Sequence, residues 1–188
     1  MHELEPFYNW QHQYVSETDP RSPFFGREHS EFEYSNTIYN YFIHPQWDDL
    51  GSKTLYGKVL MADYEEGYLV MELIGEWNDA LENDIMTLKR DVFEPFMCEG
   101  IRCFILIAEN VLNFHSDIRD YYEEWAEELA DVGGWAVCLN LPEASRREFK
   151  QASLTSYLPV MDLHDWRNYK PIHLFRKLKA EFEFPRLE

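Results

Sequence analysis

Two strand-like runs joined by a short turn place the strongest constraint on how this chain folds. Residues 54–64 (TLYGKVLMADY) and 68–76 (YLVMELIGE) are rich in apolar and β-branched side chains. Between them lie Glu65, Glu66 and Gly67, and the glycine is free to take the positive φ that a tight turn needs. The pattern predicts a β-hairpin. Because the second run is apolar on both faces, we expect it in the middle of a covered sheet.

Helix-like and strand-like segments alternate after the hairpin. A first helix is predicted to start at Asn78 or Asp79 and to kink or end at Pro95; its apolar stripe is Leu81, Ile85, Leu88, Val92 and Phe96. Residues 101–108 (IRCFILIA) follow as a core strand. A second helix is predicted with Ser116 as its N-cap and with the apolar stripe Ile118, Tyr122, Trp125, Leu129 and Val132.

The last third of the chain completes the alternating order. Residues 135–141 predict a third core strand, residues 142–153 a third helix behind Pro142, and residues 171–181 a final basic helix. The predicted fold class is therefore α/β. A mixed sheet is built from a β-hairpin and from parallel strands that alternate with helices. We divide the chain into an N-terminal extension (1–53), a core (54–160) and a C-terminal helical extension (161–188).

The N-terminal extension is unusually aromatic. Residues 1–30 predict a short helix or an irregular arm, and residues 36–43 (NTIYNYFI) predict one strand that ends at His44 and Pro45. A disordered tail would be poor in aromatic residues. We therefore expect this extension to pack onto the core.

The charge of the chain is strongly negative, with a formal net charge of -18. Phosphate backbones repel such a surface, which argues against nucleic-acid binding. Residues 146–188 differ, with nine basic and six acidic residues. This basic segment is expected to dock on the acidic body of its own chain or of a second copy; contact with another anionic partner is the alternative. A protein partner or a homo-oligomer is expected.

Cysteine usage and hydropathy indicate the compartment. Cys98, Cys103 and Cys138 lie in or beside apolar runs and are interpreted as buried thiols in a reducing environment. The first ten residues are acidic and lack the apolar core of a signal peptide, and no run approaches 18 apolar residues. We expect a cytoplasmic protein without a membrane segment.

Two local patterns resemble a known family. Residues 73–78 (LIGEWN) are similar to the strand-end turn L-x-G-E-L-D that leads into the first helix of the STAS domain, the fold of bacterial anti-sigma-factor antagonists. Residues 105–108 (ILIA), followed by 111–116 (VLNFHS), resemble the central strand of that family and the loop after it. The resemblance spans Val59 to Val160 and implies a STAS-like core. The rest of the chain resembles conserved bacterial proteins, which implies no function.

The sequence departs from the family where the family's switch lies. The family loop reads close to D-S-S-G and carries a phosphorylatable serine. In this chain His115 replaces the aspartate, Ser116 the first serine, Asp117 the phosphorylated serine and Ile118 the glycine. Asp117 carries one negative charge where a phosphate carries nearly two. The resemblance therefore implies the fold without the phosphorylation switch.

Polar residues follow the predicted core strands and form a candidate ligand site. The carboxyl ends of parallel strands meet at one edge of an open α/β sheet, where ligands bind. We expect this site to contain Glu76, Glu109, Asn113, His115 and Ser116. The alternative is structural: Asn78 or Asp79 and Ser116 cap helices, and Asn113 occupies a tight turn.

A second cluster contains metal-ligating residue types. His44, Asp48 and Asp49 combine an imidazole with two carboxylates, but their spacing matches no known metal motif. The alternative is a strand-ending turn, and no metal is expected. The glycine fingerprints of nucleotide sites and the elbow of serine hydrolases are absent, so no cofactor is expected.

Two hypotheses about function remain. The first is a non-catalytic regulatory or protein-interaction module with a STAS-like core. The alternative is an enzyme or binding protein for a small ligand or metal, with its site at the carboxyl ends of the core strands. The sequence favours the first, because no nucleophile–base pair or glycine motif supports a reaction.

Overall fold

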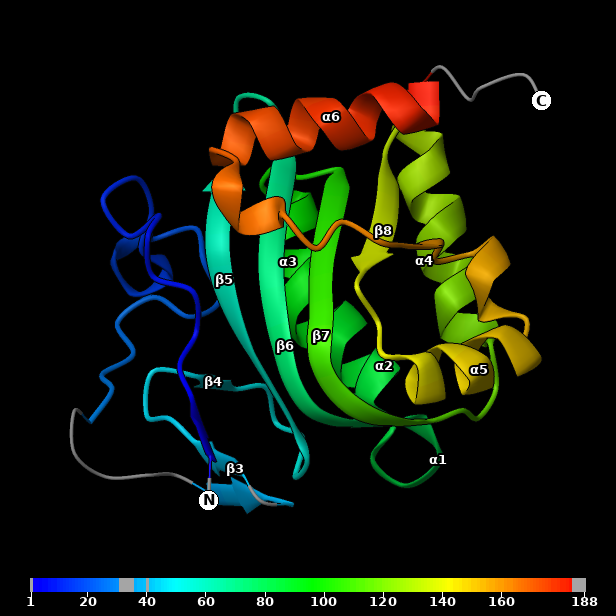
Figure 1. Ribbon diagram of the computed structural model, residues 1–188. Helices are drawn as coiled ribbons and strands as arrows, with labels where there is room; N and C mark the ends of the chain where they lie inside the picture. Colours follow the sequence, from blue (N-terminus) through cyan, green and yellow to red (C-terminus); the bar gives the residue numbers. More distant parts are fainter. Residues whose placement is uncertain (1, 31–35, 40, 184–188) are drawn as a thin grey trace.

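The computed structural model describes residues 2–30, 36–39 and 41–183, and a six-stranded mixed sheet forms its centre (Figure 1). The strand order is β4-β5-β6-β7-β8-β9. Strands β4, β5 and β6 pair antiparallel, whereas β6 to β9 pair parallel. The bounds are Asp48–Asp49, Leu55–Asp63, Tyr68–Asn78, Cys103–His115, Trp135–Leu139 and Val160–Met161. The predicted fold class is confirmed.

The hairpin β5–β6 has the expected turn. Asp63 pairs with Tyr68, and Gly67 has φ 80° at the tight connection. Every described residue of β6 except Glu76 is buried, as expected for a strand apolar on both faces in a sheet covered on both sides.

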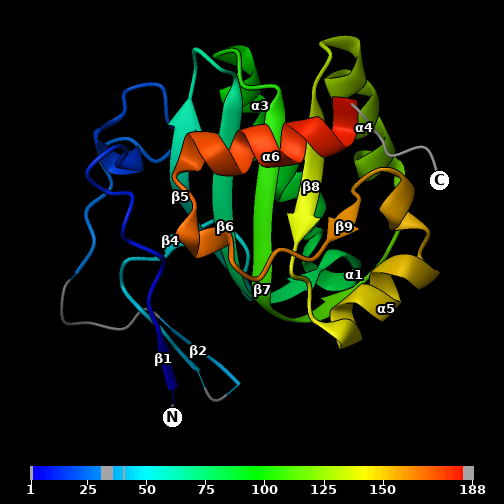
Figure 2. The ribbon, with the colours of Figure 1, turned by 45° about the horizontal axis from the view of Figure 1, so that its top comes forward.

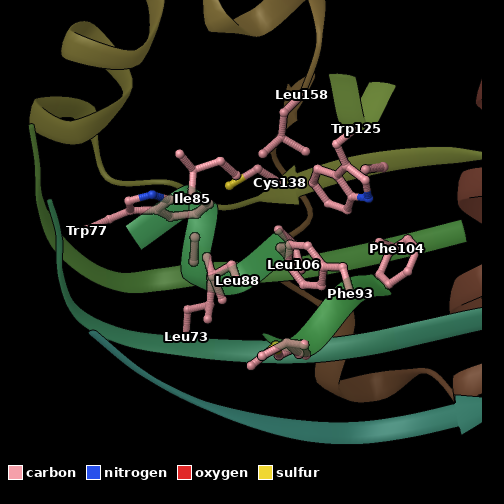
Figure 3. Close-up of a cluster of buried hydrophobic side chains, with 14 of the residues drawn as sticks. Leu73, Trp77, Ile85, Leu88, Phe93, Phe104, Leu106, Trp125, Cys138 and Leu158 are labelled. Carbon is pink, nitrogen blue, oxygen red and sulfur yellow. The ribbon is translucent and has the colours of Figure 1, made fainter. Parts of the chain in front are cut away.

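Helices cover one face of the sheet and enclose the larger core. They are α1 (Asp79–Glu82), α2 (Asp84–Thr87), a π-helical segment (Leu88–Phe93), α3 (Glu94–Cys98), α4 (Asp120–Asp131) and α5 (Glu143–Gln151). Figure 3 shows Phe93 and Trp125 facing Phe104 of β7 in this core. Phe93 and Trp125 stack with their ring centroids 4.4 Å apart. Burial of such aromatic area supplies the main stabilisation of this layer.

The opposite face is covered by the last helix, α6 (Pro171–Glu183), which crosses the strands in Figure 2. Phe175 of α6 stacks on Tyr68 at 4.4 Å, and Trp166 packs against Trp10 of the N-terminal arm at 5.8 Å. Arg176 lies 3.6 Å from Glu66, so the basic segment contacts the acidic body of its own chain.

The N-terminal extension packs on the core and folds differently from the expectation. Strands β1 (His2–Leu4), β2 (Asn36–Ile38) and β3 (Tyr41–Ile43) form a separate sheet in the order β1-β3-β2. The single strand predicted over 36–43 is wrong, because the chain reverses at Tyr39, where φ is 53°. Residue 40 of that predicted strand and residues 31–35, which precede it, lie outside the described residues. Among the described residues up to 30, the only helical element is a 3-10 turn at Ser16–Thr18, and Phe24 is buried in the core.

The predicted helix from Asn78 to residue 96 is interrupted. Asn78 caps α1 as expected by accepting a hydrogen bond from the Leu81 amide, but Asn83 then takes a left-handed conformation (φ 53°) and ends α1. The helix then has wider, π-type turns from Leu88 to Phe93. Pro95 follows in the first turn of α3, where a residue without an amide hydrogen is tolerated. As a result Leu81 is 82% exposed instead of buried.

The wider π turn places Lys89 inside the molecule, where sequence periodicity gave no reason to expect a charge. Its ammonium contacts Glu94 at 2.8 Å, Glu128 at 3.0 Å and Glu124 at 3.4 Å. Glu124 and Glu128 of α4 therefore serve as counter-ions of a buried cation.

The second helix starts later than predicted. Strand β7 continues to His115, and α4 begins at Asp120 with Arg119 at the N-cap position, so Ser116 is not its cap. Tyr122, Trp125 and Leu129 are buried as predicted, whereas Ile118 and Val132 are exposed. Cys98 is also exposed, contrary to its interpretation as a buried thiol, while Cys103 and Cys138 are buried.

None of the helices in the described part of the chain is both long enough and apolar enough to cross a membrane. The division of the chain at residues 53 and 160 stays a prediction.

Gly75 provides a test of how tightly β6 passes its neighbours. Its φ is 115°, and a Cβ at this position would lie 2.1 Å from the carbonyl oxygen of Thr54. We expect Gly75→Ala to lower the free energy of unfolding by about 1–3 kcal/mol in urea titrations. Gly133→Ala is the matched control, because Gly133 has φ 66° with nothing within 4 Å. Equal losses in the two variants would show that close approach to Thr54 contributes nothing.

Candidate functional site

The carboxyl ends of β6 and β7 bring three of the predicted site residues together. The parallel register pairs Glu76 with Asn113 and Asn78 with His115. His115 Nε2 lies 3.4 Å from Glu76 Oε1 and 3.1 Å from Asn113 Nδ2. Asn78 Nδ2 donates to Glu76 Oε1 at 2.9 Å. Glu76, Asn113 and His115 therefore lie together at one edge of the sheet, where neighbouring parallel strands end.

Tyr39 completes this cluster, and sequence reasoning did not select it. Its hydroxyl donates to Glu76 Oε2 at 2.7 Å and accepts from Asn113 Nδ2 at 3.4 Å. The hydrogen bond to Glu76 is the main reason that the pKa of Tyr39 is raised, and burial adds to it. Tyr39 reaches the edge from the turn after β2, so no local sequence pattern connects it with β6.

The hydrogen bonds of Glu76 limit what the cluster can do. One carboxylate oxygen accepts from Asn78 and the other from Tyr39. A general base needs a carboxylate oxygen aimed at a substrate proton. Here Oε1 bonds to Asn78 of the same strand, whereas Oε2 bonds to Tyr39 and so positions the turn between β2 and β3 against the edge of the core.

Glu109, which was expected in the same cluster, lies elsewhere. An irregularity in the β6–β7 pairing matches Glu72 to Ile107 but Ile74 to Asn110, so β7 contains one extra residue between these pairs. Glu109 lies beside Glu72, because Arg167 contacts both, and Glu72 precedes Glu76 by four residues on the same face of β6. Glu109 pairs with Arg167, and Trp166 Nε1 donates to it at 3.3 Å, under the cover of the C-terminal extension.

Glu72 lies beside this second group of charges and is almost completely buried. Its Oε2 accepts a hydrogen bond from the Phe7 amide at 2.8 Å, and Arg167 lies 3.8 Å from Oε1. Burial raises the pKa of Glu72 to about 7; the Phe7 hydrogen bond and Arg167 oppose the shift, and Glu109 adds to it. Sequence reasoning missed Glu72, although an acidic residue inside an apolar strand was a usable signal.

Ser116 follows β7 in the loop to α4 and is half-buried. It caps no helix, and no hydrogen bond of its side chain connects it with Glu76 or His115 among the interactions that the structure describes. Its membership of a ligand site stays a prediction.

The residues proposed from sequence as weak metal ligands do not converge. His44 Nε2 faces Glu5 at 3.6 Å, and Asp49 Oδ1 accepts from the Gly51 amide at 2.7 Å. Asp48 points instead toward Lys58 of β5 and toward His29 of the N-terminal arm. Alternation along β4 separates Asp48 from Asp49, because successive side chains of a strand point to opposite faces.

Two exposed apolar side chains lie at the same sheet edge as the Glu76 cluster. Leu81 follows Asn78 by three residues, and Ile118 follows His115 by three residues. Because Asn78 and His115 are register partners, the segments that follow β6 and β7 leave the sheet from neighbouring positions. Leu81 is 82% exposed and Ile118 is 56% exposed. We call Leu81 and Ile118 together the apolar edge pair.

Comparisons with known proteins add structural similarities. No protein-family model matches the chain, and no curated protein matches it either. A similar solved structure is the anti-sigma factor antagonist SpoIIAA in its unphosphorylated form. It is 15% identical with a TM-score of 0.49, and the match covers 66% of this chain and 96% of that one.

Two further structures are similar. The Bacillus cell fate determinant SpoIIAA in its phosphorylated form is 16% identical with a TM-score of 0.44, covering 65% of this chain and 98% of that one. The protein TM1081 is 15% identical with a TM-score of 0.42, covering 82% and 98%. The resemblance to anti-sigma-factor antagonists read from the sequence is thus found among solved structures as well. At this level of similarity no function follows from it.

Proposed function

We propose that this chain is a non-catalytic regulatory module that binds a partner protein at the carboxyl edge of β6 and β7. The observation that carries the proposal is the apolar edge pair. Leu81 and Ile118 expose large apolar side chains, and each follows one of the register partners Asn78 and His115 by three residues. Single exposed apolar residues are ordinary, but apolar residues gathered at one place favour a binding surface.

The surroundings of the apolar edge pair indicate the chemistry of the partner. Glu82, Asp117 and Asp120 lie within three residues of Leu81 or Ile118, against the single base Arg119 in the same segment. An acidic rim around apolar contacts attracts a partner with basic residues around an apolar anchor, and it speeds their encounter. The net charge of -18 favours such a partner over a nucleic acid.

The Glu76 cluster supports the same proposal from the structural side. Tyr39, Glu76 and Asn113 bond to one another and fix the edge on which the apolar edge pair stands. A surface that is already ordered loses little conformational entropy on binding. The proposal places the protein in the cytoplasm, with a second copy of the chain as the other possible partner.

A surface-charge substitution tests the proposal. We expect the double variant Leu81→Asp, Ile118→Asp to lose at least tenfold in affinity for the partner, because buried anchors dominate interface energies. Partners are captured from the host with the wild-type chain, identified by mass spectrometry, purified and titrated by calorimetry. Stability should change by less than about 0.5 kcal/mol, since both side chains are exposed.

Val132→Asp is the matched control, because Val132 is 57% exposed and lies at the other end of α4. It should leave the affinity unchanged. Light scattering on the same three proteins detects self-association. Equal affinity of wild type and double variant, or no specific partner and no self-association, would overturn the proposal.

A further inference from the structure

Three metal-ligating side chains from distant parts of the sequence converge outside the Glu76 cluster. Glu17 and His29 come from the N-terminal arm and Asp48 from β4, and one ligand atom of each lies within 4.8 Å of the others. His29 Nε2 is 2.8 Å from Glu17 Oε1 and 3.1 Å from Asp48 Oδ1. We propose that Glu17, His29 and Asp48 bind a divalent first-row transition-metal ion such as Zn²⁺ or Mn²⁺, which takes the place of the Lys58 ammonium.

The burial of Asp48 is the second observation that points to a cation. Its side chain is completely buried, and neither carboxylate oxygen accepts a hydrogen bond from a described residue. The neighbours of these oxygens are cationic or can become so: His29 at 3.1 Å, Lys58 at 3.6 Å and Arg27 at 3.8 Å. A buried carboxylate is costly unless it is hydrogen-bonded, paired or bound to a metal. The surroundings of the Asp48 carboxylate therefore suit a bound cation.

Lys58 marks the position of that cation. Its ammonium forms a close ion pair with Glu17 while only 9% of its side chain is exposed. The ammonium supplies one positive charge between the two carboxylates, with Arg27 as a further cation 3.8 Å from Asp48, whereas a divalent ion supplies two charges at one position. Ligand atoms around a tetrahedral Zn²⁺ lie about 3.3 Å apart, given bonds of about 2.0–2.1 Å. The imidazole nitrogen is already 2.8 Å and 3.1 Å from the two carboxylates, and since all three ligand atoms lie within 4.8 Å of one another, the carboxylates need to approach by at most about 1.5 Å.

A neighbouring cavity gives the ion a way in and the ammonium a way out. The cavity has a volume of about 230 Å³, and both Glu17 and Lys58 line it, together with Tyr8 and Tyr14 of the arm. The flexible stem of Lys58 can swing into this space when an ion arrives. A binding site needs such an entry path as well as suitable ligands.

The donor set decides the class of metal. One imidazole nitrogen with two carboxylate oxygens suits Zn²⁺, Mn²⁺ or Fe²⁺, whereas Mg²⁺ and Ca²⁺ prefer oxygen ligands alone. Three protein ligands leave at least one coordination position for water or for a group from a bound molecule. The inference is independent of the proposed partner surface, which uses other residues.

Metal titration of the full chain tests the inference. The metal-free protein carries Cys98→Ser, which removes the one exposed cysteine, and is titrated with Zn²⁺, Mn²⁺ and Mg²⁺ against a chromophoric chelator; bound metal is counted by mass spectrometry. We expect one Zn²⁺ per chain and no stoichiometric Mg²⁺. Asp48→Asn and His29→Gln should each weaken Zn²⁺ binding by at least tenfold. Lys58→Met should strengthen it by about tenfold or more, because the competing ammonium is gone.

Two controls keep the test decisive. Lys53→Met removes an exposed lysine paired with Glu82 at 3.4 Å and should leave Zn²⁺ affinity unchanged. Glu17→Gln replaces Asp48→Asn if the latter does not fold, as judged by circular dichroism. Zn²⁺ bound equally by the ligand variants would place the ion elsewhere and overturn the inference. Binding by Lys58→Met alone would also overturn it, because Lys58 would then be the permanent counter-ion in the native chain.

Discussion

Replacing Asp79 with alanine is expected to lower the free energy of unfolding by about 3–5 kcal/mol, because three buried donors lose the acceptor that they share. The Asp79 carboxylate receives three hydrogen bonds: from Tyr122 Oη at 2.6 Å, and from Trp77 Nε1 and the Ile85 amide at 2.9 Å each. All three donors are buried. Alanine leaves every one of them without an acceptor, and each loss costs about 1–3 kcal/mol before relaxation.

Two milder variants separate the hydrogen bonds from the charge. Asp79→Asn keeps Oδ1 as the acceptor for Trp77 and Ile85, and its amide can face the Tyr122 hydroxyl, so we expect a loss of less than about 2 kcal/mol. Tyr122→Phe removes one donor and is expected to cost about 1 kcal/mol. Urea titrations of the three variants provide the measurement. A loss for Asp79→Ala no larger than that for Tyr122→Phe would contradict the account of a shared network.

The Asp79 network illustrates what the sequence predicts well. Asp79 follows a strand apolar on both faces and opens a helix, so its place at the end of β6 follows from the pattern of residues 68–79. The same reasoning gives the hairpin, the parallel order of β6, β7 and β8, and the convergence of Glu76, Asn113 and His115. These features depend on local periodicity and on the rule that parallel strands end at one edge.

The features that escaped prediction depend on contacts between distant segments. Tyr39 reaches Glu76 across 37 positions and Arg167 reaches Glu109 across 58 positions, so neither contact follows from local sequence. Asn83 breaks the first helix by adopting a left-handed conformation, which asparagine tolerates but does not require. Asp48 was grouped with His44 and Asp49, but its neighbours come from residues 17 and 29, and not from adjacent positions.

Glu72 is expected to make the protein more stable at mildly acidic pH than at alkaline pH. Burial raises its pKa in the folded protein to about 7, from an ordinary value of 4.5. Between these two values the folded state binds the proton that the unfolded chain releases. The contribution of Glu72 to stability is therefore full below about pH 4.5 and is lost as the pH rises through about 7. The shift corresponds to about 3 kcal/mol across this window.

The variant Glu72→Gln isolates this contribution, because glutamine has nearly the same shape and carries no charge. Its side-chain oxygen can still accept the hydrogen bond from the Phe7 amide. We expect the variant to match the wild type at pH 4.5 and to exceed its unfolding free energy by about 3 kcal/mol at pH 8. Urea titrations at a series of pH values give the unfolding free energies of the variant and the wild type. The effect of the overall net charge on stability is nearly the same in both proteins, so it cancels in their difference.

Glu109→Gln is the matched control, because it removes an acid that also faces Arg167 but is less buried than Glu72. Its difference from the wild type should vary much less between pH 4.5 and pH 8. A constant difference for Glu72→Gln over the same range would show that Glu72 ionises normally in the fold. If instead the difference grows with pH, Glu72 is the titrating group, and the desolvation cost of its charge exceeds what the ionised carboxylate gains from the hydrogen bond of the Phe7 amide.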